Sequence, residues 1–354
     1  MKKVDYTLMF SVIIITIFGL VMISSSSYVW AEYKFNNPYK YLINQGIFFI
    51  LSLISMYVVS KIDYKILYKY SKVFILIVII MLILVIIPGI GTVRNGSRSW
   101  FGIGGFGIQP SEFAKLAIII FASKYLSENK NSRLPILFLG LFLFGLIMLQ
   151  PDFGTGMVLI MIVVSLLFIS GMKISFFIRI GLLGVIGITI LILIAPYRLK
   201  RILSFLNPWS DPLGSGFQII QSLYAIGPGG LFGLGLGNSV QKHFYLPEPQ
   251  TDFIFAIISE EFGFLGIIIV SILFLTIIIS SINIALKSKD LFSKYLVFGI
   301  TFWISFQTIL NLMVVVGLIP VTGVTLPFLS YGGSSLLILY TSIGIILNVS
   351  RYQI

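Results

Sequence analysis

The chain has 354 residues, of which 24 are Lys or Arg and 12 are Asp or Glu, and 58% of the residues are apolar. Charged residues make up 10% of the chain, against about 25% in soluble domains, which excludes a water-soluble globular surface. The apolar runs lack the alternation of a membrane β-barrel, so the composition predicts one all-α polytopic membrane domain over residues 1–354.

The apolar runs predict ten membrane-spanning helices, at residues 7–28, 41–60, 72–90, 110–126, 134–150, 154–170, 174–196, 252–286, 295–316 and 331–349. The first run follows two lysines and resembles a secretory signal, but further spans follow and no A-x-A cleavage site is evident, so we expect a retained helix. The longest connection is a large outer loop at about 197–251, between the seventh and eighth helices. Long loops in compact proteins are usually functional.

The positions of the basic residues predict the orientation of the chain in the membrane. Of the 24 Lys and Arg residues, 15 fall on the side of the N-terminus and eight on the opposite side. The positive-inside rule therefore predicts that both termini are cytoplasmic. The net charge of +12 is then explained by the cations that set the orientation and by those on the outer face. No nucleic-acid partner is expected.

Several charged residues stand within predicted spans or at their outer ends, where loss of hydration makes them costly and suggests function. Glu112 and Lys115 are three residues apart, so they share a helix face and are able to pair, which also permits a purely structural, neutralising role. Asp152 and Asp252 stand at the outer starts of the sixth and eighth spans. Each is either a functional acid or a helix N-cap.

For the other candidates, the structural alternative is favoured over the functional one. Glu260 and Glu261 are functional acids, or acids that are solvated or paired with cations of the outer loop. His243 is the only histidine and there is no cysteine, so zinc sites and Ser–His nucleophiles are not supported. A P-loop motif is also absent. Beside aromatic neighbours, His243 is expected to pack at the interface.

The remaining carboxylates and cations suit the transfer of a sugar from a lipid diphosphate. A carboxylate would take the proton of the acceptor hydroxyl, and cations would hold the departing diphosphate. Arg198, Lys200 and Arg201 directly follow the seventh span, at the level of the lipid headgroups. They are either diphosphate ligands or interface anchors.

Four sequence blocks resemble the SEDS family of peptidoglycan glycosyltransferases, to which FtsW, RodA and SpoVE belong. The blocks are Arg98-Ser99-Trp100 with Gln109–Lys115, Gln150–Thr155, Ala195–Gly266 with its Thr251-Asp252-Phe253, and Gly317–Ser335. Asn207-Pro208-Trp209 and Pro247-Glu248-Pro249-Gln250 resemble the division and sporulation branch, of the stage V sporulation protein E and FtsW types.

The resemblance implies polymerisation of lipid II into glycan strands at the outer face of the bacterial cytoplasmic membrane, with a septal location. It assigns catalysis to Asp252 and implies importance for Trp100, Glu112, Lys115 and Asp152. We expect the diphosphate to be held by the cations Arg98, Arg198, Arg201 and Lys242. A class B penicillin-binding protein is the implied partner. No organic cofactor is expected, and a divalent cation is compatible with the diphosphate although no ligand set is readable.

Two other functions remain open from the sequence. A lipid II flippase would also carry buried charges, but it predicts polar residues across the full membrane depth. The intramembrane acids and Lys115 instead cluster toward the outer half of the predicted spans. A scaffold that recruits a transpeptidase predicts that removal of the Asp252 charge leaves growth intact.

Overall fold

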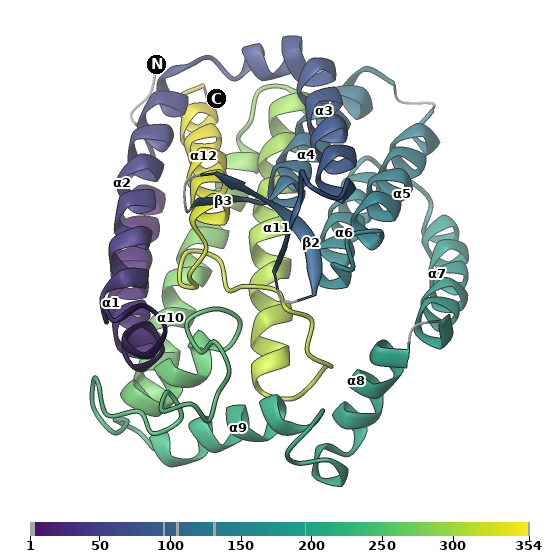
Figure 1. Cartoon of the computed structure of the whole chain (residues 1–354). Coiled ribbons are helices and arrows are strands. Elements are labelled where there is room, and N and C mark those ends of the chain that lie inside the picture. The colour runs from purple at the N-terminus through teal and green to yellow at the C-terminus, as the bar shows by residue number, and fades with distance from the viewer. Residues whose placement is uncertain (1–3, 95, 104–105, 130–131, 195, 353–354) are drawn as a thin grey trace.

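The computed structural model describes the whole chain except residues 1–3, 95, 104–105, 130–131, 195 and 353–354. Its described residues form mostly helices (Figure 1). The α-helices are α1 Tyr6–Phe35, α2 Lys40–Lys61, α3 Lys65–Ile86, α4 Pro110–Glu128, α5 Leu134–Met148, α6 Phe153–Ile169, α7 Ile174–Ile194, α8 Pro196–Leu206, α9 Phe217–Ile226, α10 Ile254–Leu286, α11 Leu291–Val315 and α12 Gly333–Ser350. Short 3₁₀ turns lie at Pro208–Ser210 and Gly227–Gly229.

Seven of the helices in the described chain are long and apolar enough to cross a membrane, namely α1, α2, α3, α7, α10, α11 and α12. Two more, α5 and α6, are apolar but shorter. The protein is therefore a multi-pass helical membrane protein with seven strongly apolar candidate spans. The count of ten spans stays a prediction, because α4 carries charges and α5 and α6 are short for a bilayer of about 30 Å.

The connection between α3 and α4 was expected to be a loop and instead contains a small antiparallel sheet. Its strands are β1 Thr92–Arg94, β2 Ser97–Ile103 and β3 Phe106–Ile108, in the order β1-β2-β3. Aromatic and β-branched residues in this connection favour extended backbone. The strands are only three to seven residues long, too short for a clear two-residue pattern.

Figure 1 shows both termini at the same end of the helices, whereas α8, α9 and the long connection to α10 lie at the opposite end. Helix α12 packs against α2, α4 packs against α3 and α11, and α1 packs against α10. This arrangement brings the charged start of α4 beside the carboxyl-terminal third of the chain.

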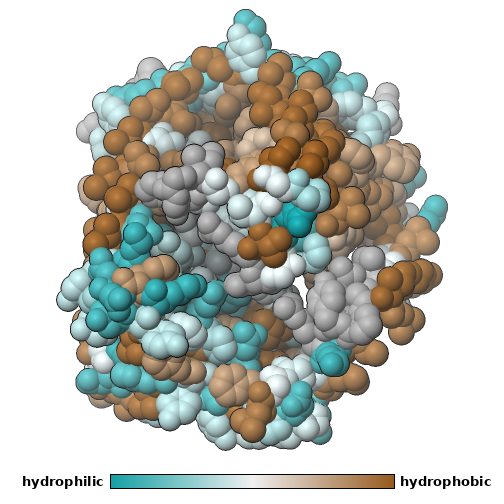
Figure 2. Space-filling view, viewed as in Figure 1, coloured by the Kyte–Doolittle hydropathy of each residue, from teal (hydrophilic) through white to brown (hydrophobic). Residues whose placement is uncertain are grey.

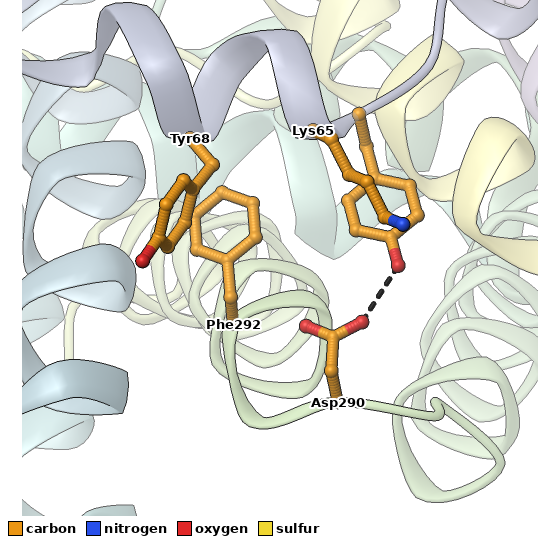
Figure 3. A pocket seen from close by; sticks show the side chains of 5 residues that line it. Lys65, Tyr68, Asp290 and Phe292 are labelled. Atoms are coloured by element: carbon orange, nitrogen blue, oxygen red, sulfur yellow. Dashed lines mark hydrogen bonds between the residues drawn. The ribbon is translucent and has the colours of Figure 1, made fainter.

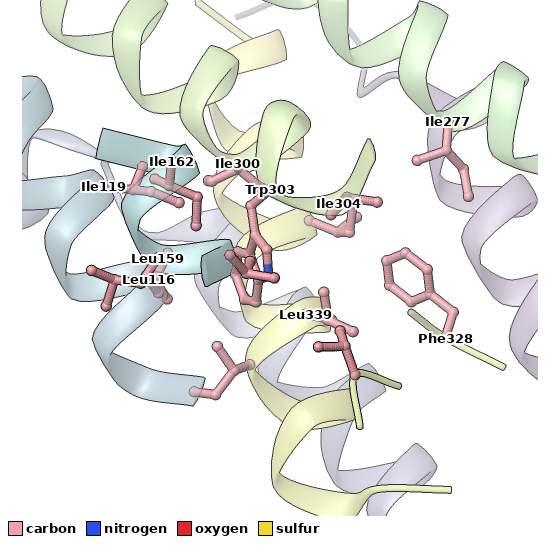
Figure 4. Packing of buried hydrophobic residues seen from close by; sticks show 14 of the residues in the cluster. Leu116, Ile119, Leu159, Ile162, Ile277, Ile300, Trp303, Ile304, Phe328 and Leu339 are labelled. Atoms are coloured by element: carbon pink, nitrogen blue, oxygen red, sulfur yellow. The ribbon is translucent and has the colours of Figure 1, made fainter. Parts of the chain in front are cut away.

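The buried core includes Trp303 of α11, a large side chain that is fully enclosed. Figure 4 shows Trp303 among aliphatic side chains from several helices, including Leu116 of α4 and Leu159 of α6. Such close packing holds the helices in one arrangement. It therefore gives the polar groups of α4 and α11 fixed positions relative to each other.

The outer surface of the helices is strongly apolar, as expected for contact with lipid. Figure 2 shows hydrophobic residues over the upper and right parts of that view, while hydrophilic residues gather at its lower left. Helix α7 is the extreme case, since none of its most apolar window is buried within the protein. Soluble monomers rarely expose so much contiguous apolar surface.

Helix α10 is interrupted at Gly263, whose φ of 61° and ψ of −153° are not helical. The carbonyls of Glu260 and Glu261 accept hydrogen bonds from the backbone N–H groups of residues 234 and 235. The N–H groups just after the break donate to carbonyls of segment 229–231. The long outer connection therefore satisfies the backbone that the break exposes, which is the condition for irregular backbone in a membrane protein.

Candidate active site

The segment between α11 and α12, residues 316–332, lies at the centre of the candidate site, and we call it the α11–α12 loop. Two side-chain amides of α11 hold it. Asn311 Nδ2 donates to the carbonyl of Val324 at 2.8 Å, and Gln307 Nε2 donates to the carbonyl of Thr325 at 2.9 Å. Both amides are buried, so the loop backbone is fixed to the core at two successive residues.

Asp252 stands two residues before the start of α10 and faces this loop. Its carbonyl accepts a hydrogen bond from Asn311 Nδ2 at 2.7 Å, and Ser330 Oγ donates to the neighbouring carbonyl of Thr251 at 2.7 Å. A Cβ atom added to Gly323 would lie 3.7 Å from Asp252 Oδ2, so the loop backbone runs past the carboxylate. The N-cap of α10 is the following residue, and the capping alternative for Asp252 is wrong.

Glu112 and Lys115 form the predicted ion pair on α4, with 2.7 Å between Lys115 Nζ and Glu112 Oε1. Both side chains are almost fully buried. Lys115 also donates to Gln307 Oε1 at 3.0 Å and lies 4.7 Å from the ring centroid of Trp303. Glu112 Oε2 accepts from Ser335 Oγ at 2.9 Å. The pair thus joins α4 to α11 and α12, through the same amide that holds the α11–α12 loop.

Asp152 caps α6, which confirms the capping alternative for this residue. Its Oδ1 accepts from the N–H of Thr155 at 3.1 Å, and its Oδ2 accepts from Gln109 Nε2 at 3.0 Å. The start of α6 approaches the α11–α12 loop closely, because a Cβ atom on Gly154 would lie 2.4 Å from the carbonyl oxygen of Thr322. Only glycine fits there, and Asp152 is thereby held next to the loop.

Arg98 and Trp100 lie on β2 and are both partly exposed. The sheet is joined to the turn before α6 by a hydrogen bond from Ser97 Oγ to the carbonyl of Gln150. Since Gln150 stands two residues before Asp152 in the chain, β2 lies beside the capped start of α6. The structure therefore places these two predicted residues at the edge of the same cluster.

Lys242 lies in the outer connection before α10, in a separate buried cluster with acids of that helix. Its Nζ is 3.2 Å from Glu261 Oε1 and donates to the carbonyl of Gly237 at 2.5 Å. Ser25 of α1 donates to the same carboxylate at 2.6 Å. The pairing alternative for Glu261 is thus confirmed. Its neighbour Glu260 accepts hydrogen bonds from the segment 239–241.

Arg198 and Arg201 belong to α8, but their side chains lie outside the described part of the structure. Lys200, between them, is exposed. Helix α8 begins two residues after α7 ends. Its backbone therefore starts where an apolar helix ends, and a position of these cations at the level of the lipid headgroups stays a prediction.

Sequence reasoning missed the polar residues that connect the predicted ones. Trp303, Gln307 and Asn311 recur at intervals of four on α11, so they form one buried stripe that reaches from Lys115 to Asp252. Amides in an apolar helix are a recognisable signal, because they need hydrogen-bond partners in the membrane interior. Ser330 carried no such signal, since serine is common in helices and loops.

Among the residues that the structure describes, three or more His, Asp or Glu side chains nowhere converge as a metal cage. Magnesium-type ions commonly use one or two carboxylates and complete their coordination with substrate phosphates.

A further pocket of about 230 Å³ lies away from this cluster, between the starts of α3 and α11 (Figure 3). It is lined by Tyr64, Lys65, Tyr68, Asp290 and Phe292. The ring of Tyr64 is 5.5 Å from that of Tyr352 near the C-terminus. The pocket is thus at the end of the molecule that carries the termini.

The family model of the FtsW, RodA and SpoVE cell cycle proteins matches residues 6–354 of the chain. The chain belongs to this family. It is 50% identical to stage V sporulation protein E of Bacillus subtilis over 356 residues, which covers 99% of this chain and 97% of the relative. It is 42% identical to a probable peptidoglycan glycosyltransferase FtsW of Coxiella burnetii, covering 94% and 92% of the two chains.

Solved structures of the family share the fold. One chain from a study of polymerization and crosslinking by a peptidoglycan synthase complex superposes with a TM-score of 0.81 at 30% identity, over 100% of both chains. The rod shape determining protein RodA of Thermus thermophilus superposes with a TM-score of 0.74 at 27% identity, over 99% of this chain and 98% of the other. The predicted membership of the SEDS family is therefore confirmed.

Proposed function

We propose that this protein is a peptidoglycan glycosyltransferase that polymerises lipid II at the outer face of the bacterial cytoplasmic membrane. The observation that carries the proposal is the position of Asp252, on a backbone hydrogen-bonded to the α11–α12 loop, which the capped start of α6 also approaches closely. Relatives named as probable peptidoglycan glycosyltransferases support the reaction class.

In the proposed reaction the Asp252 carboxylate takes the proton from the 4-hydroxyl of the acceptor GlcNAc. The freed oxygen attacks the anomeric carbon of a lipid-linked MurNAc and forms the new glycosidic bond. The bond between that carbon and the diphosphate breaks, and the lipid diphosphate leaves with the electron pair. Attack opposite the leaving group inverts the anomeric centre. A positioned base contributes typically about 10²–10⁴-fold to such a rate.

The charge that develops on the diphosphate needs cations nearby. The proposed cations are Arg98 of β2 and the arginines at positions 198 and 201 of α8. Lys242 keeps this proposed role only if its ammonium exchanges Glu261 for the diphosphate, since the two are paired here. A divalent cation would add positive charge at the same diphosphate, with acids of the cluster as its protein ligands.

The Glu112–Lys115 pair is proposed to hold the cavity in shape rather than to transfer protons. Lys115 is held by Glu112, Gln307 and the face of Trp303. An ammonium with these partners is strongly constrained. Through Gln307 it supports the loop that faces Asp252.

The proposed setting is a chain of ten spans with both termini cytoplasmic and its outer loop at 197–251. The partner is a class B penicillin-binding protein, which would crosslink the strands that this protein makes. A related chain of known structure comes from a peptidoglycan synthase complex of polymerization and crosslinking, which supports this pairing. We propose a septal location in division or sporulation, by likeness to FtsW and stage V sporulation protein E.

The proposal is tested with purified full-length protein and lipid II, with and without a candidate transpeptidase. We expect wild-type protein to form glycan strands and Asp252→Asn to form none, while both proteins show the same thermal unfolding. Polymerisation by Asp252→Asn would contradict the role of Asp252. Movement of lipid II across vesicles without polymerisation by the wild type would favour the flippase instead.

A further inference from the structure

Two buried side chains fasten the backbone around Asp252 to the α11–α12 loop. Asn311 Nδ2 donates both to the carbonyl of Asp252 at 2.7 Å and to the carbonyl of Val324 at 2.8 Å. Ser330 Oγ donates to the carbonyl of Thr251 at 2.7 Å and accepts from a loop N–H at 2.8 Å. Each side chain thus bridges the same two segments, 250–252 and 324–330.

The hydrogen bonds of the Asn311 side chain differ from those of Asn348, a buried asparagine away from the site. Asn311 is fully buried, and its Oδ1 has no hydrogen-bond partner among the described residues. Asn348 of α12 is also buried, but it donates to the carbonyl of Ser60 and accepts from the N–H of Tyr64. Leaving a buried acceptor unpaired destabilises a fold. The two donations toward Asp252 and the loop are therefore what Asn311 supplies.

The fastening has a direct geometric consequence for the carboxylate. The loop backbone at Gly323 lies against Asp252 Oδ2, and Gly323 precedes the Val324 carbonyl that Asn311 holds. Any shift of the loop or of the Asp252 backbone would therefore change where the carboxylate points. Misplacement by about 1 Å is enough to slow a reaction about 10²-fold.

We infer that Asn311 and Ser330 are positioning residues, which act through Asp252 by holding its backbone and the facing loop in one register. Neither needs to touch the substrate. The inference rests on the proposed function, because it takes Asp252 to be the base that acts on the acceptor hydroxyl.

The test compares matched variants of full-length protein in the lipid II assay. Asn311→Asp keeps the shape but loses both N–H donors, and Asn311→Ala removes the side chain. Asn348→Asp and Asn348→Ala are the controls, because Asn348 is equally buried and lies far along α12 from the site. We expect kcat to fall about 100-fold in the Asn311 variants, with KM nearly unchanged, and both values to stay near wild type in the controls.

A second pair of variants covers the case in which Asn311 variants do not fold. Ser330→Ala removes the hydrogen bond from Ser330 to the carbonyl of Thr251. Ser222→Ala is its control, since Ser222 is a buried serine that donates to the carbonyl of Val315 at 2.7 Å. Ser330→Ala should lower kcat, whereas Ser222→Ala should not. Hydrogen exchange should rise locally in segments 250–253 and 322–326 for the Asn311 and Ser330 variants alone.

The outcomes separate the inference from the proposed function. Wild-type kcat in folded Asn311 and Ser330 variants would overturn the inference, as would equal losses in the Asn348 and Ser222 controls. Polymerisation by Asp252→Asn in the same assay would instead overturn the role of Asp252. In that case, unchanged exchange at 250–253 in the Asn311 variants would still refute the fastening itself.

Discussion

Lys242 of the outer connection pairs with Glu261, which stands two residues before the break in α10, with 3.2 Å between the ammonium and the carboxylate. Both side chains are buried, at 6% and 0% exposure. The pair joins segment 237–242 of the outer connection to the helix that begins after Asp252. Its loss should therefore loosen the outer connection as well as the helix.

We predict that Lys242→Met destabilises the protein by about 3–5 kcal/mol, because removal of one partner leaves the other charge buried and unpaired. The double variant Lys242→Met with Glu261→Gln should regain part of that stability. Thermal unfolding in detergent measures both. Lys40→Met is the control, since Lys40 is exposed and its loss should change stability by less than about 0.5 kcal/mol. A Lys242→Met protein as stable as this control would show that the pair contributes nothing.

Lys115→Met should have two separable effects. Stability should fall by about 3–5 kcal/mol, since Glu112 then stays buried without its cation, and adding Glu112→Gln should restore much of it. Polymerase activity should stay low in the double variant, because Gln307 loses the ammonium that holds it beside the α11–α12 loop. The measurements are unfolding temperature and lipid II turnover. Full activity in the double variant would mean that the pair acts only on stability.

Gly263→Ala should disrupt the break in α10. An added Cβ would lie 2.4 Å from the backbone nitrogen of Gly233, and the φ of 61° disfavours any side chain. We expect a loss of at least about 2 kcal/mol. Gly46→Ala in α2 is the matched control, since nothing lies within 4 Å of its added Cβ. That change should stabilise the helix by about 0.5–1 kcal/mol. Similar unfolding temperatures for the two variants would contradict the clash.

The bond between Tyr64 and Asp290 predicts a dependence of stability on pH. Partial desolvation opposes ionisation of Asp290, but hydrogen bonds from Tyr64 and Ser293 outweigh it and hold the pKa of this carboxyl below its usual value. A lowered folded-state pKa stabilises the protein above about pH 4, and this contribution is lost as the pH falls through the folded-state pKa.

Asp290→Asn keeps a helix cap but removes the charge, so it isolates the contribution of the ionised carboxylate to stability. Since Asp290 is exposed, we expect it to be less stable than wild type by only about 0.5–1 kcal/mol at pH 7. The difference should shrink toward pH 3. Unfolding measured across that range provides the test, and a difference that grows on acidification would refute the assigned sign.

Much of the site was readable from the sequence because its signals are local. The spacing of Glu112 and Lys115 predicted their pairing. For Asp152 and for Glu261, one of the two alternatives was the contact observed, a helix cap and an ion pair respectively. Other parts were not readable. The partner of Lys242 is Glu261, and a single lysine in a loop carries no information about which distant carboxylate it will meet.

The sequence by itself determined that this is a helical membrane protein of the SEDS family. Apolar runs and intramembrane charges are properties of short segments. They can be interpreted without the fold, because the unfavourable hydration of apolar runs and the cost of dehydrating charges depend on the local sequence. Only the tertiary structure decided what surrounds Asp252. The bonds from Asn311 and Ser330 link positions 59 and 79 residues away in the chain, and such partners are chosen by helix packing, which no short segment encodes.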